Sequence, residues 1–302
     1  MLMLVDAAGL YFRAFYSVPD SVTAPDGRPT NAIRGYLDMS AMVIKQRRPS
    51  RHVACLDVSW RPEFRVALVP TYKAHRVAAD GGEEIPDALS PQVPLLIEVL
   101  DALGLATAGA HGFEADDVMA TLSARDTDRV EVLTGDRDML ALASERVRIL
   151  YSGKGISKLA DMGPAEVSER YGIPAEFYAD FAILRGDPSD GLPGVPGIGE
   201  KTAAVIVSRF GPIESIVAAA QTSSEGFPAG AANKVLAALD YLAVAPGAVR
   251  GRFDVPLDVI DDALPTKAAD AERLAELTAT LGIDNSIRRI QDAIAAALAD
   301  PS

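Results

Sequence analysis

The sequence predicts an α/β protein with a parallel sheet in its first half and mostly helices in its second half. Up to about residue 163, short apolar runs alternate with segments of helical periodicity, which is typical of a parallel sheet. The apolar runs are nearly continuous, as expected for strands that are buried on both faces. Beyond that point the strand signal weakens and helical patterns follow one another.

The first half is expected to contain four strands and four helices. The strands are predicted near residues 1–6, 52–57, 130–135 and 146–151. The helices are predicted near residues 31–47, 91–103, 114–125 and 137–143. Residues 72–91 contain Gly81-Gly82 and two prolines with little apolar periodicity, so we expect a mobile or an excursive segment there.

In the second half, Gly163-Pro164 is expected to begin a short helix, because proline suits the first helical position. Further helices are predicted near residues 174–185, 200–209, 212–220, 230–243 and 271–280. Residues 221–230 are rich in serine, glycine and proline, and they are expected to form a loop.

Composition fits a globular protein of 302 residues, of which 49% are hydrophobic. A net charge of −13 argues against a nucleic-acid partner, but a local basic stripe matters more than the sum. The single cysteine, Cys55, excludes an intrachain disulfide. No uncharged apolar run reaches the ~20 residues of a membrane span, and the N-terminus lacks the basic region of a signal peptide. We therefore expect a cytoplasmic protein that does not bind membranes.

Three carboxylates lie at the ends of predicted strands: Asp6, Asp57 and Asp136. Open α/β sheets bind ligands at the carboxyl ends of their strands, so these side chains should meet at one rim. Six more acids occur at helix starts or turns further along the chain, namely Glu114, Asp116, Asp117, Asp138, Asp187 and Asp190.

Carboxylates packed this closely would repel one another, and a divalent cation would remove the repulsion. Oxygen ligands without histidine or cysteine suit Mg²⁺, and a pair of such ions suits the hydrolysis of a phosphodiester. Any one of these acids taken alone is more often a helix cap or a solvated loop residue. As a set, they indicate a magnesium-dependent enzyme that acts on phosphates.

Two further segments are suited to phosphate contact. Residues 191–202 form a glycine-rich turn before a helix; Glu200 separates Gly199 from Lys201, so this is not a nucleotide-binding phosphate loop. Its backbone amides could hold a DNA phosphate, or it could be an ordinary tight turn. The basic patch at residues 72–76 is either a solvated surface or a contact to the substrate phosphate.

Several motifs in order resemble the bacterial 5′ nucleases, that is, the 5′–3′ exonuclease domain of DNA polymerase I and the stand-alone flap endonucleases. The resemblance runs from Leu2 to at least Ala203. It is carried by Phe64-Arg65 with Tyr72-Lys73, Gly112-Phe113-Glu114-Ala115-Asp116-Asp117, the turn from Asp136 to Asp138, Gly186-Asp187-Pro188-Ser189-Asp190, and Gly194-Val195-Pro196-Gly197-Ile198-Gly199-Glu200-Lys201-Thr202-Ala203.

The resemblance implies a PIN-like nuclease core over residues 1–170 and a helical DNA-binding domain over residues 171–302. It further implies a helix–three-turn–helix motif near residues 187–209 and an arch at residues 72–91, through which a single-stranded 5′ end passes. Two departures stand out: Phe12 replaces a tyrosine that stacks on a base, and Gly191 replaces an asparagine.

The resemblance also carries over a role for each matching residue. Two or more Mg²⁺ ions, for which Mn²⁺ can substitute, would be held at two sites. The first site would use Asp6, Asp57, Glu114 and Asp116; the second would use Asp136, Asp138 and Asp187, with Asp117 and Asp190 in support. Lys73 and Arg76 would contact the scissile phosphate as catalytic residues. Contacts to DNA are expected from Phe12, Arg13, Arg65, Tyr72, Gly194, Gly197, Gly199, Lys201 and Thr202, and some relatives hold a potassium ion at the glycine-rich turn.

The resulting hypothesis is a structure-specific 5′ nuclease of DNA replication and repair, acting on 5′ flaps, overhangs and nicked or gapped duplex. Since the chain ends at Ser302, a polymerase or ligase would act as a separate protein. One alternative is a DNA-binding scaffold that grips junctions without cutting them. Another is a single-strand RNA nuclease of the PIN type, which would not need the duplex grip of residues 191–203.

Overall fold

A six-stranded sheet forms the centre of the molecule, in a computed structural model that describes residues 1–79 and 81–300. The strand order is β3-β2-β1-β4-β5-β6; the first five strands are parallel and β6 is antiparallel to β5. The strands are β1 (Leu2–Asp6), β2 (Arg51–Cys55), β3 (Ala106–Ala108), β4 (Val130–Thr134), β5 (Val147–Tyr151) and β6 (Ala160–Met162). The predicted parallel sheet is confirmed; β3 and β6 are three-residue edge strands that the sequence did not predict.

Side chains of the central strands alternate between two apolar layers. On β1, Leu2 and Leu4 belong to one buried cluster, while Met3 and Val5 belong to the other. All five residues of β1 are buried. A strand covered on both faces has no polar alternation, which explains the continuous apolar run in the sequence.

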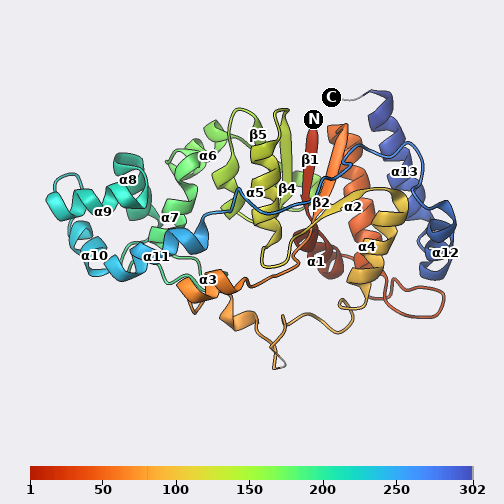
Figure 1. Ribbon diagram of the computed structural model, residues 1–302, viewed down its shortest axis with the longest axis horizontal. Coiled ribbons are helices and arrows are strands. Elements are labelled where there is room, and N and C mark those ends of the chain that lie inside the picture. Colours follow the sequence, from red (N-terminus) through yellow and green to blue (C-terminus); the bar gives the residue numbers. More distant parts are fainter. Residues whose placement is uncertain (80, 301–302) are drawn as a thin grey trace.

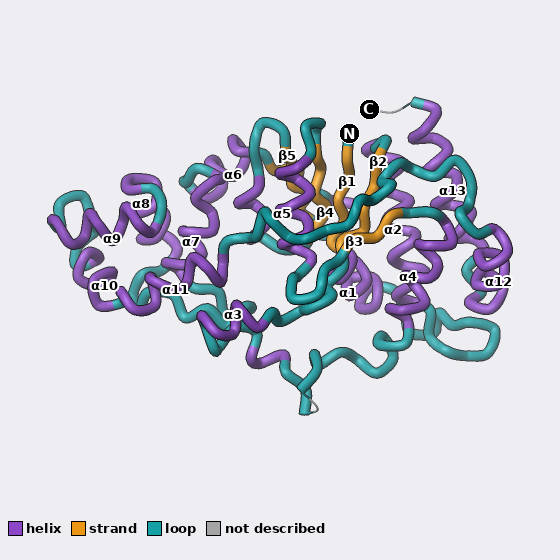
Figure 2. The backbone as a smooth tube through the Cα atoms, viewed as in Figure 1, coloured by secondary structure: helices purple, strands orange, loops and turns teal. Residues whose placement is uncertain are grey.

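Helices cover both faces of the sheet (Figures 1 and 2). One face carries α1 (Ala7–Ser17), α2 (Asn31–Arg47), α4 (Gln92–Leu103), α12 (Ala271–Leu281) and α13 (Asp284–Ala299). The other face carries α5 (Ala115–Arg125), the 3-10 helix Asp138–Leu142 and α6 (Pro164–Tyr171). A helix was expected at residues 137–143; the single 3-10 stretch there is shorter and more tightly wound.

The remaining helices lie beyond the edge of the sheet formed by β5 and β6, on the left of Figure 1. They are α7 (Tyr178–Arg185), α8 (Glu200–Phe210), α9 (Ile213–Thr222), α10 (Ala231–Ala237) and α11 (Leu239–Val249), and α3 (Glu63–Leu68) packs against α11. The helical second half is thus confirmed, with the expected helix at residues 230–243 divided into α10 and α11. Within the described residues, no single helix is long and apolar enough to cross a membrane. Only α8 and α9 taken together reach that length and composition, and they are bent by 87° relative to each other.

The last two helices return to the sheet. From the family resemblance, residues 171–302 were expected to form one helical domain. α12 contacts α4, and α13 lies along α2. On α13, Ile287, Ile290 and Ile294 are buried in the same cluster as the apolar residues of α2. Their spacing of three and four residues is helical, but the alanines between them weaken the apolar stripe, and this helix was not predicted.

Residues 250–264 connect the two groups of helices by crossing α5. The carbonyl of Arg252 accepts a hydrogen bond from the Thr121 hydroxyl at 3.1 Å, and the Arg125 guanidinium donates to the carbonyl of Val255 at 2.6 Å. Further along, the amide of Leu264 donates to the carbonyl of Ser50 at 3.1 Å, beside the start of β2. This connection therefore binds the helical region to the sheet along its whole length.

The segment at residues 72–91 runs from the α3 side of the molecule to α4 along its lower edge in Figure 1. It contains the 3-10 turn Ala74–Arg76 and an isolated antiparallel pair between Val77 and Glu83. The amide of Glu84 donates to the carbonyl of Arg76 at 2.8 Å. The excursion expected from the sequence is present, and backbone hydrogen bonds order its base.

Gly191 lies where the helical region meets the base of this segment. Its φ is +70°, and a Cβ atom built there would lie 2.1 Å from the carbonyl oxygen of Thr71. The Thr71 hydroxyl donates to the carbonyl of Gly191 at 2.7 Å, and the Lys73 amide donates to the carbonyl of Asp190 at 2.9 Å. Close backbone approach therefore explains the glycine that departs from the family pattern.

Replacing Gly191 with asparagine should lower the midpoint of thermal unfolding much more than the same change at Gly172. Both glycines have φ close to +70°, which asparagine tolerates better than other residues, but Gly172 has open space where a Cβ would lie. The Gly172→Asn control should cost about 1 kcal/mol or less, whereas Gly191→Asn must separate two hydrogen-bonded segments. Equal losses for the two variants would show that the close approach is not a constraint.

His52 is a buried histidine on β2, paired with Met3 of β1. Among the described residues, neither ring nitrogen has a hydrogen-bond partner. Burial lowers the pKa of His52 to about 4, because the protonated ring would lose its hydration without gaining a partner. The folded state therefore keeps this side chain neutral well below the pH at which an unfolded chain takes up a proton.

The unfolding free energy should fall as the pH drops from about 6.5 to 4, because the unfolded state then binds a proton that the folded state rejects. The loss attributable to His52 is on the order of 3 kcal/mol below that window, and it is absent above pH 6.5. Urea unfolding of the wild type and His52→Phe at a series of pH values should show this extra acid sensitivity only in the wild type. If the unfolding free energies of the two proteins fell equally as the pH dropped, His52 would not be the source of the acid sensitivity.

Candidate active site

The carboxyl ends of β1, β2 and β4 meet at a cavity of about 290 Å³, as the strand-end acids predicted. Five of the nine acids line it. They are Asp6, Asp57, Glu114, Asp116 and Asp136, and the other lining residues are Ala8, Gly9, Phe12, Lys73, Arg76, Glu83 and Gly135. The cavity is therefore acidic, with two cationic side chains in its wall.

Asp6 combines a structural and an electrostatic role. It caps α1 by accepting a hydrogen bond from the amide of Gly9 at 2.7 Å, and the Thr134 hydroxyl donates to it at 2.9 Å. Burial, and then the charge of Asp57, raise the pKa of Asp6 to about 6. Thr134, which sequence reasoning missed, also accepts from the amide of Asp136 at 2.9 Å, so one hydroxyl positions two acids.

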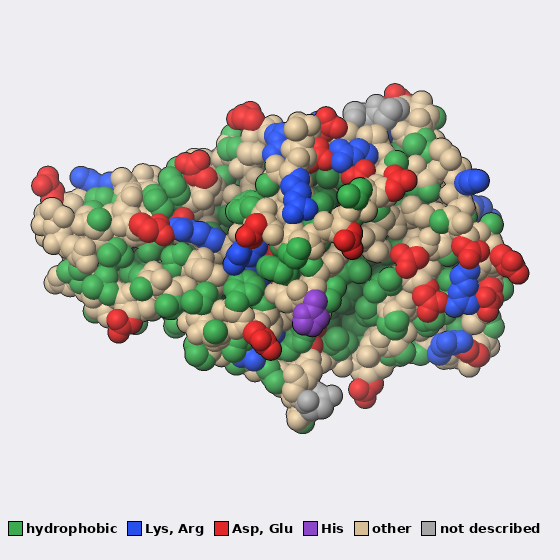
Figure 3. Space-filling model, viewed as in Figure 1, with side chains coloured by type: hydrophobic (Ala, Val, Ile, Leu, Met, Phe, Trp, Pro, Cys, Tyr) green, Lys and Arg blue, Asp and Glu red, His purple; other side chains and the backbone are tan. Residues whose placement is uncertain are grey.

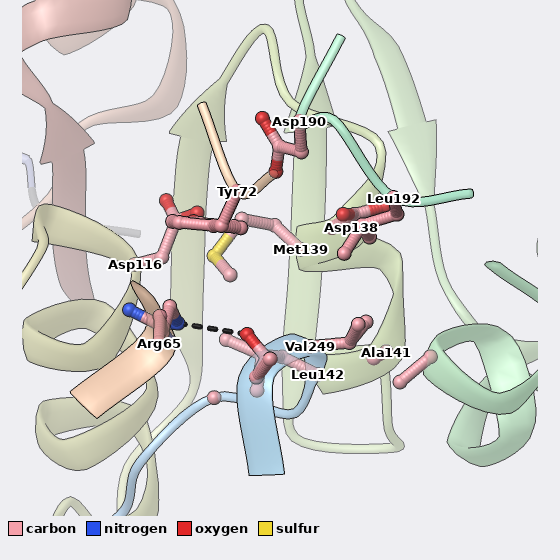
Figure 4. A pocket seen from close by; sticks show the side chains of 13 residues that line it. Arg65, Tyr72, Asp116, Asp138, Met139, Ala141, Leu142, Asp190, Leu192 and Val249 are labelled. Carbon is pink, nitrogen blue, oxygen red and sulfur yellow. Dashed lines mark hydrogen bonds between the residues drawn. The ribbon is translucent and has the colours of Figure 1, made fainter. Parts of the chain in front are cut away.

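Asp116, Asp136 and Asp138 repel one another and are poorly hydrated. Burial raises the pKa of each of them; the next cause is Asp136 for Asp116 and Asp138, and Asp190 for Asp136. One carboxylate oxygen of Asp138 is buried and has no hydrogen-bond partner in the described part of the chain. Figure 4 shows Asp116, Asp138 and Asp190 on separate elements around a narrow cavity of about 30 Å³.

Glu114 and Asp117 are held by cations at the start of α5. Both Asp117 oxygens accept hydrogen bonds from Arg65, at 2.8 and 2.7 Å, and Asp117 is fully buried. Glu114 contacts Arg65 and Lys73 and accepts a hydrogen bond from the Tyr72 hydroxyl at 2.8 Å. Asp117 is thus turned away from the acidic cavity and holds Arg65 in place.

Arg65 and Tyr72 were expected to contact DNA, but both are buried, with exposed fractions of 3% and 5%. Arg65 also donates to the carbonyl of Ala248 at 2.8 Å, the bond drawn in Figure 4. The structure therefore corrects the sequence prediction for these two residues: each supports Glu114 from below the surface.

Asp187 and Asp190 lie on the turn that faces residues 71–76. Asp187 accepts hydrogen bonds from Arg185 at 3.1 Å and from the amide of Ser189 at 2.9 Å, and it lines neither acidic cavity. Asp190 lies 3.3 Å from the Arg76 guanidinium. Of the nine predicted acids, Asp117 and Asp187 are thus the two that internal partners hold outside the cavities.

Lys73 and Arg76 stand at the base of the excursion. Lys73 has a φ of +46°, which is uncommon for a residue other than glycine, and its ammonium group contacts Glu114. Arg76 donates to the carbonyl of Ser189 at 2.7 Å. Both line the acidic cavity, so a phosphate that enters would meet these two cations.

Glu83, which the sequence did not single out, also lines the cavity. Burial, and then the charge of Asp57, raise its pKa. Glu83 lies in an irregular segment, so its position in the sequence does not indicate that it lines the cavity. The backbone pairing of Val77 with Glu83 brings it back toward the rim.

The remaining predicted DNA contacts lie in two places. Phe12 lines the acidic cavity, and Arg13 on the same helix has a buried Nε atom with no hydrogen-bond partner among the described residues. Gly197, Gly199 and Lys201 are exposed at the start of α8 and Thr202 is half-buried. Gly194, in contrast, is buried with its backbone against Gly186, where a Cβ would lie 2.5 Å from an amide nitrogen, so it shapes the turn.

The chemistry of the donor set fits a hard divalent cation. All candidate ligands are carboxylates, and their mutual repulsion would be relieved by positive charge. Across residues 1–79 and 81–300, no three carboxylate, histidine or cysteine side chains already converge closely enough to enclose an ion.

Comparisons with known proteins agree with this architecture. Residues 1–172 match the family model of the 5′-3′ exonuclease N-terminal resolvase-like domain, and residues 173–272 match that of the 5′-3′ exonuclease C-terminal SAM fold. A 5′-3′ exonuclease of Mycobacterium tuberculosis is 51% identical, over 97% of each chain. A 5′-3′ exonuclease of Streptomyces coelicolor is 50% identical, over 95% of this chain and 98% of its own.

Among solved structures, the bacteriophage T5 flap endonuclease in a pseudo-enzyme-product complex with DNA and metal ions has a similar fold. Its TM-score is 0.62 at 19% identity, over 98% of this chain and 99% of its own. Together, the two family models span residues 1–272, from β1 to the start of α12, and two relatives aligned over nearly their full length carry the same family name. The chain belongs to the 5′-3′ exonuclease family.

Proposed function

We propose that this protein is a metal-dependent, structure-specific 5′ nuclease that hydrolyses DNA phosphodiesters at junctions of single and double strands. The observation that carries the proposal is the acidic rim: five carboxylates line one cavity at the strand ends, with Lys73 and Arg76 in its wall. Membership of the 5′-3′ exonuclease family supports the same reading.

In this proposal, Mg²⁺ or Mn²⁺ ions are bound by the rim carboxylates. Asp6, Asp57, Asp116 and Asp136 line the larger cavity, and Asp138 and Asp190 line the narrow one beside it. Glu114 shares the rim but is held by Lys73 and Arg65. Bound divalent ions would supply the positive charge that activates water and stabilises the oxygens of the reacting phosphodiester.

Lys73 and Arg76 bind and orient the scissile phosphate in this scheme. The ammonium group of Lys73 rests on Glu114 and can exchange that carboxylate for a phosphate oxygen. Arg76 donates to the carbonyl of Ser189, and this bond holds its guanidinium at the wall of the cavity. Both cations would stabilise the negative charge that develops on the phosphate during hydrolysis.

Duplex DNA would be held at the start of α8. Exposed backbone amides at Gly197 and Gly199, together with Lys201 and Thr202, present donors and positive charge to a phosphate at a helix N-terminus. A potassium ion at this turn is part of the proposal. On the face drawn in Figure 3, acidic and basic side chains are interspersed, so binding would rely on such local donors. We also propose a cytoplasmic location and action beside a separate polymerase or ligase.

Cleavage of a 5′-labelled DNA flap tests the proposal directly. Wild-type protein with Mg²⁺ should cut near the junction and EDTA should abolish cutting, while Asp136→Asn should reduce the rate by about a hundredfold or more. Asp258→Asn, which changes an exposed acid outside the cavities, is the matched control and should cut normally. Metal-tolerant binding without cutting would support a junction-binding scaffold instead, and preference for single-stranded RNA would support an RNA nuclease.

Asp138→Asn should stabilise the metal-free protein at neutral pH. The raised pKa of Asp138 means that its ionised form is penalised in the folded state, and an uncharged isostere removes that penalty. In EDTA the midpoint of thermal unfolding should rise, while the further rise on adding Mg²⁺ should shrink relative to wild type.

Asp161→Asn is the control with the opposite sign. Although partial burial opposes it, hydrogen bonds from Arg148 and Arg47 lower the pKa of Asp161, so its charge stabilises the fold. This variant should therefore melt earlier than wild type in EDTA and keep the full response to Mg²⁺. A loss of stability in Asp138→Asn similar to that in Asp161→Asn would contradict the metal-site assignment of Asp138.

A further inference from the structure

A second cavity, of about 650 Å³, lies on the outer side of the loops that carry Asp57 and Glu114. It lies between residues 58–62, the start of α3 and residues 111–113. Its wall includes three aromatic side chains, Trp60, Phe64 and Phe113, together with the imidazole of His111. The volume is in the range of ~300–1,000 Å³ that is usual for small-molecule sites.

The aromatic pocket and the acidic rim are built on the same loops. Val58 follows Asp57, and Phe113 precedes Glu114 in the chain. Phe64 precedes Arg65, the guanidinium that holds Glu114. Residues of the pocket wall are therefore covalent neighbours of residues that position the rim carboxylates.

Local hydrogen bonds keep the pocket open. The amide of Ser59 donates to the carbonyl of Phe113 at 3.2 Å, and the Ser59 hydroxyl accepts from the amide of Gly112 at 2.9 Å. Arg61 donates to the carbonyls of Tyr72 and Pro70, the latter at 3.1 Å. The two loops are thus tied to each other and to the base of the excursion, so the cavity is pre-formed.

Stacking is the interaction that this wall offers best. The rings of Phe64 and Phe113 are inclined by 49° with centroids 6.1 Å apart. The guanidinium groups of Arg65 and Arg252 lie over the Phe64 ring, 5.0 and 5.6 Å from its centroid, so Trp60 and Phe113 are the rings left for a planar group to stack on. Aromatic side chains bind unpaired bases in this way without reading their sequence.

Charge argues for a base rather than a phosphate in the pocket. Glu63 and Arg61 both lie in the wall, so their opposite charges offset each other and a phosphate would gain no net attraction there. Two donor nitrogens of Arg61 are already used by backbone carbonyls. A neutral nucleobase does not depend on such attraction, and the Ser59 hydroxyl and His111 imidazole offer polar groups to its edge.

We propose that this pocket binds an unpaired nucleobase from the single-stranded arm of the DNA substrate, next to the cleavage site. The inference rests on the proposed nuclease function and adds a stacking subsite to it. The base would stack on Trp60 and Phe113, and the adjoining backbone would then lead toward Lys73 and the acidic rim.

Trp60 is the only tryptophan in the chain, so its fluorescence reports on this pocket alone. In EDTA, where cleavage is blocked, and again with Ca²⁺, titration with a 5′-flap duplex should quench Trp60 emission. A nicked duplex of the same length without a flap should bind, as measured by anisotropy of a label on the DNA, with little quenching. Binding of the flap without any change in Trp60 emission would overturn the proposal.

Substitutions at the pocket provide an independent test. Trp60→Leu should weaken binding of the flap substrate by about tenfold and leave the nicked duplex unaffected, while Trp60→Phe should recover most of the affinity. His111→Ala changes an exposed side chain that the fold does not need, and should weaken only flap binding, by a smaller factor. If both substrates weakened equally, or neither did, the pocket would not be a base subsite.

The two proposals can fail separately. If wild type cuts the flap and neither Trp60→Leu nor His111→Ala changes the rate, the base subsite is refuted and the nuclease proposal stands. Absence of binding to every DNA substrate would remove both. A thermal unfolding midpoint within a few degrees of wild type for each variant shows that the comparison concerns binding and not folding.

Discussion

A buried guanidinium joins the two halves of this molecule. Arg65 donates to Asp117 and Glu114 at the start of α5 and to the carbonyl of Ala248 at the end of α11. Removing one partner of such a buried network typically costs about 3–5 kcal/mol, because the other charges are left without compensation. Arg65 is therefore one of the contacts that fix the sheet and its acidic rim relative to the helices that would hold duplex DNA, together with residues 250–264 and the contact between Thr71 and Gly191.

The predicted acids differ in how the fold compensates their negative charge. Glu114 and Asp117 are neutralised by internal cations, and Asp187 by Arg185 and the backbone of its own turn. Asp6, Asp116 and Asp136 are held by no such cation in the described part of the chain, and burial in the cavity raises the pKa of each of them. Carboxylates that no cation of the fold neutralises can still bind a positively charged ligand. Functional sites usually differ from structural ion pairs in this respect.

The strand-end acids could be predicted from the sequence, because the end of a parallel strand fixes both position and direction. Adjacent acids on a helix could not be separated in the same way. Asp116 and Asp117 are neighbours in the chain, yet successive helical residues point about 100° apart, so one faces the cavity and the other faces Arg65. Arg65 itself is a charged residue that sequence reasoning places on the surface, and only its partners 49 and 52 residues away explain its burial.

The position of α13 in the sequence determines when the sheet can be fully covered during folding. The apolar face of α2, which closes one side of the sheet, is covered by a helix that begins at Asp284, more than two hundred residues later in the chain. Contacts at such sequence separation form late, because a long loop must close first. During synthesis that face must therefore stay uncovered until α13 has been made, and a nascent chain at that stage exposes an apolar surface to chaperones and to other copies of the chain.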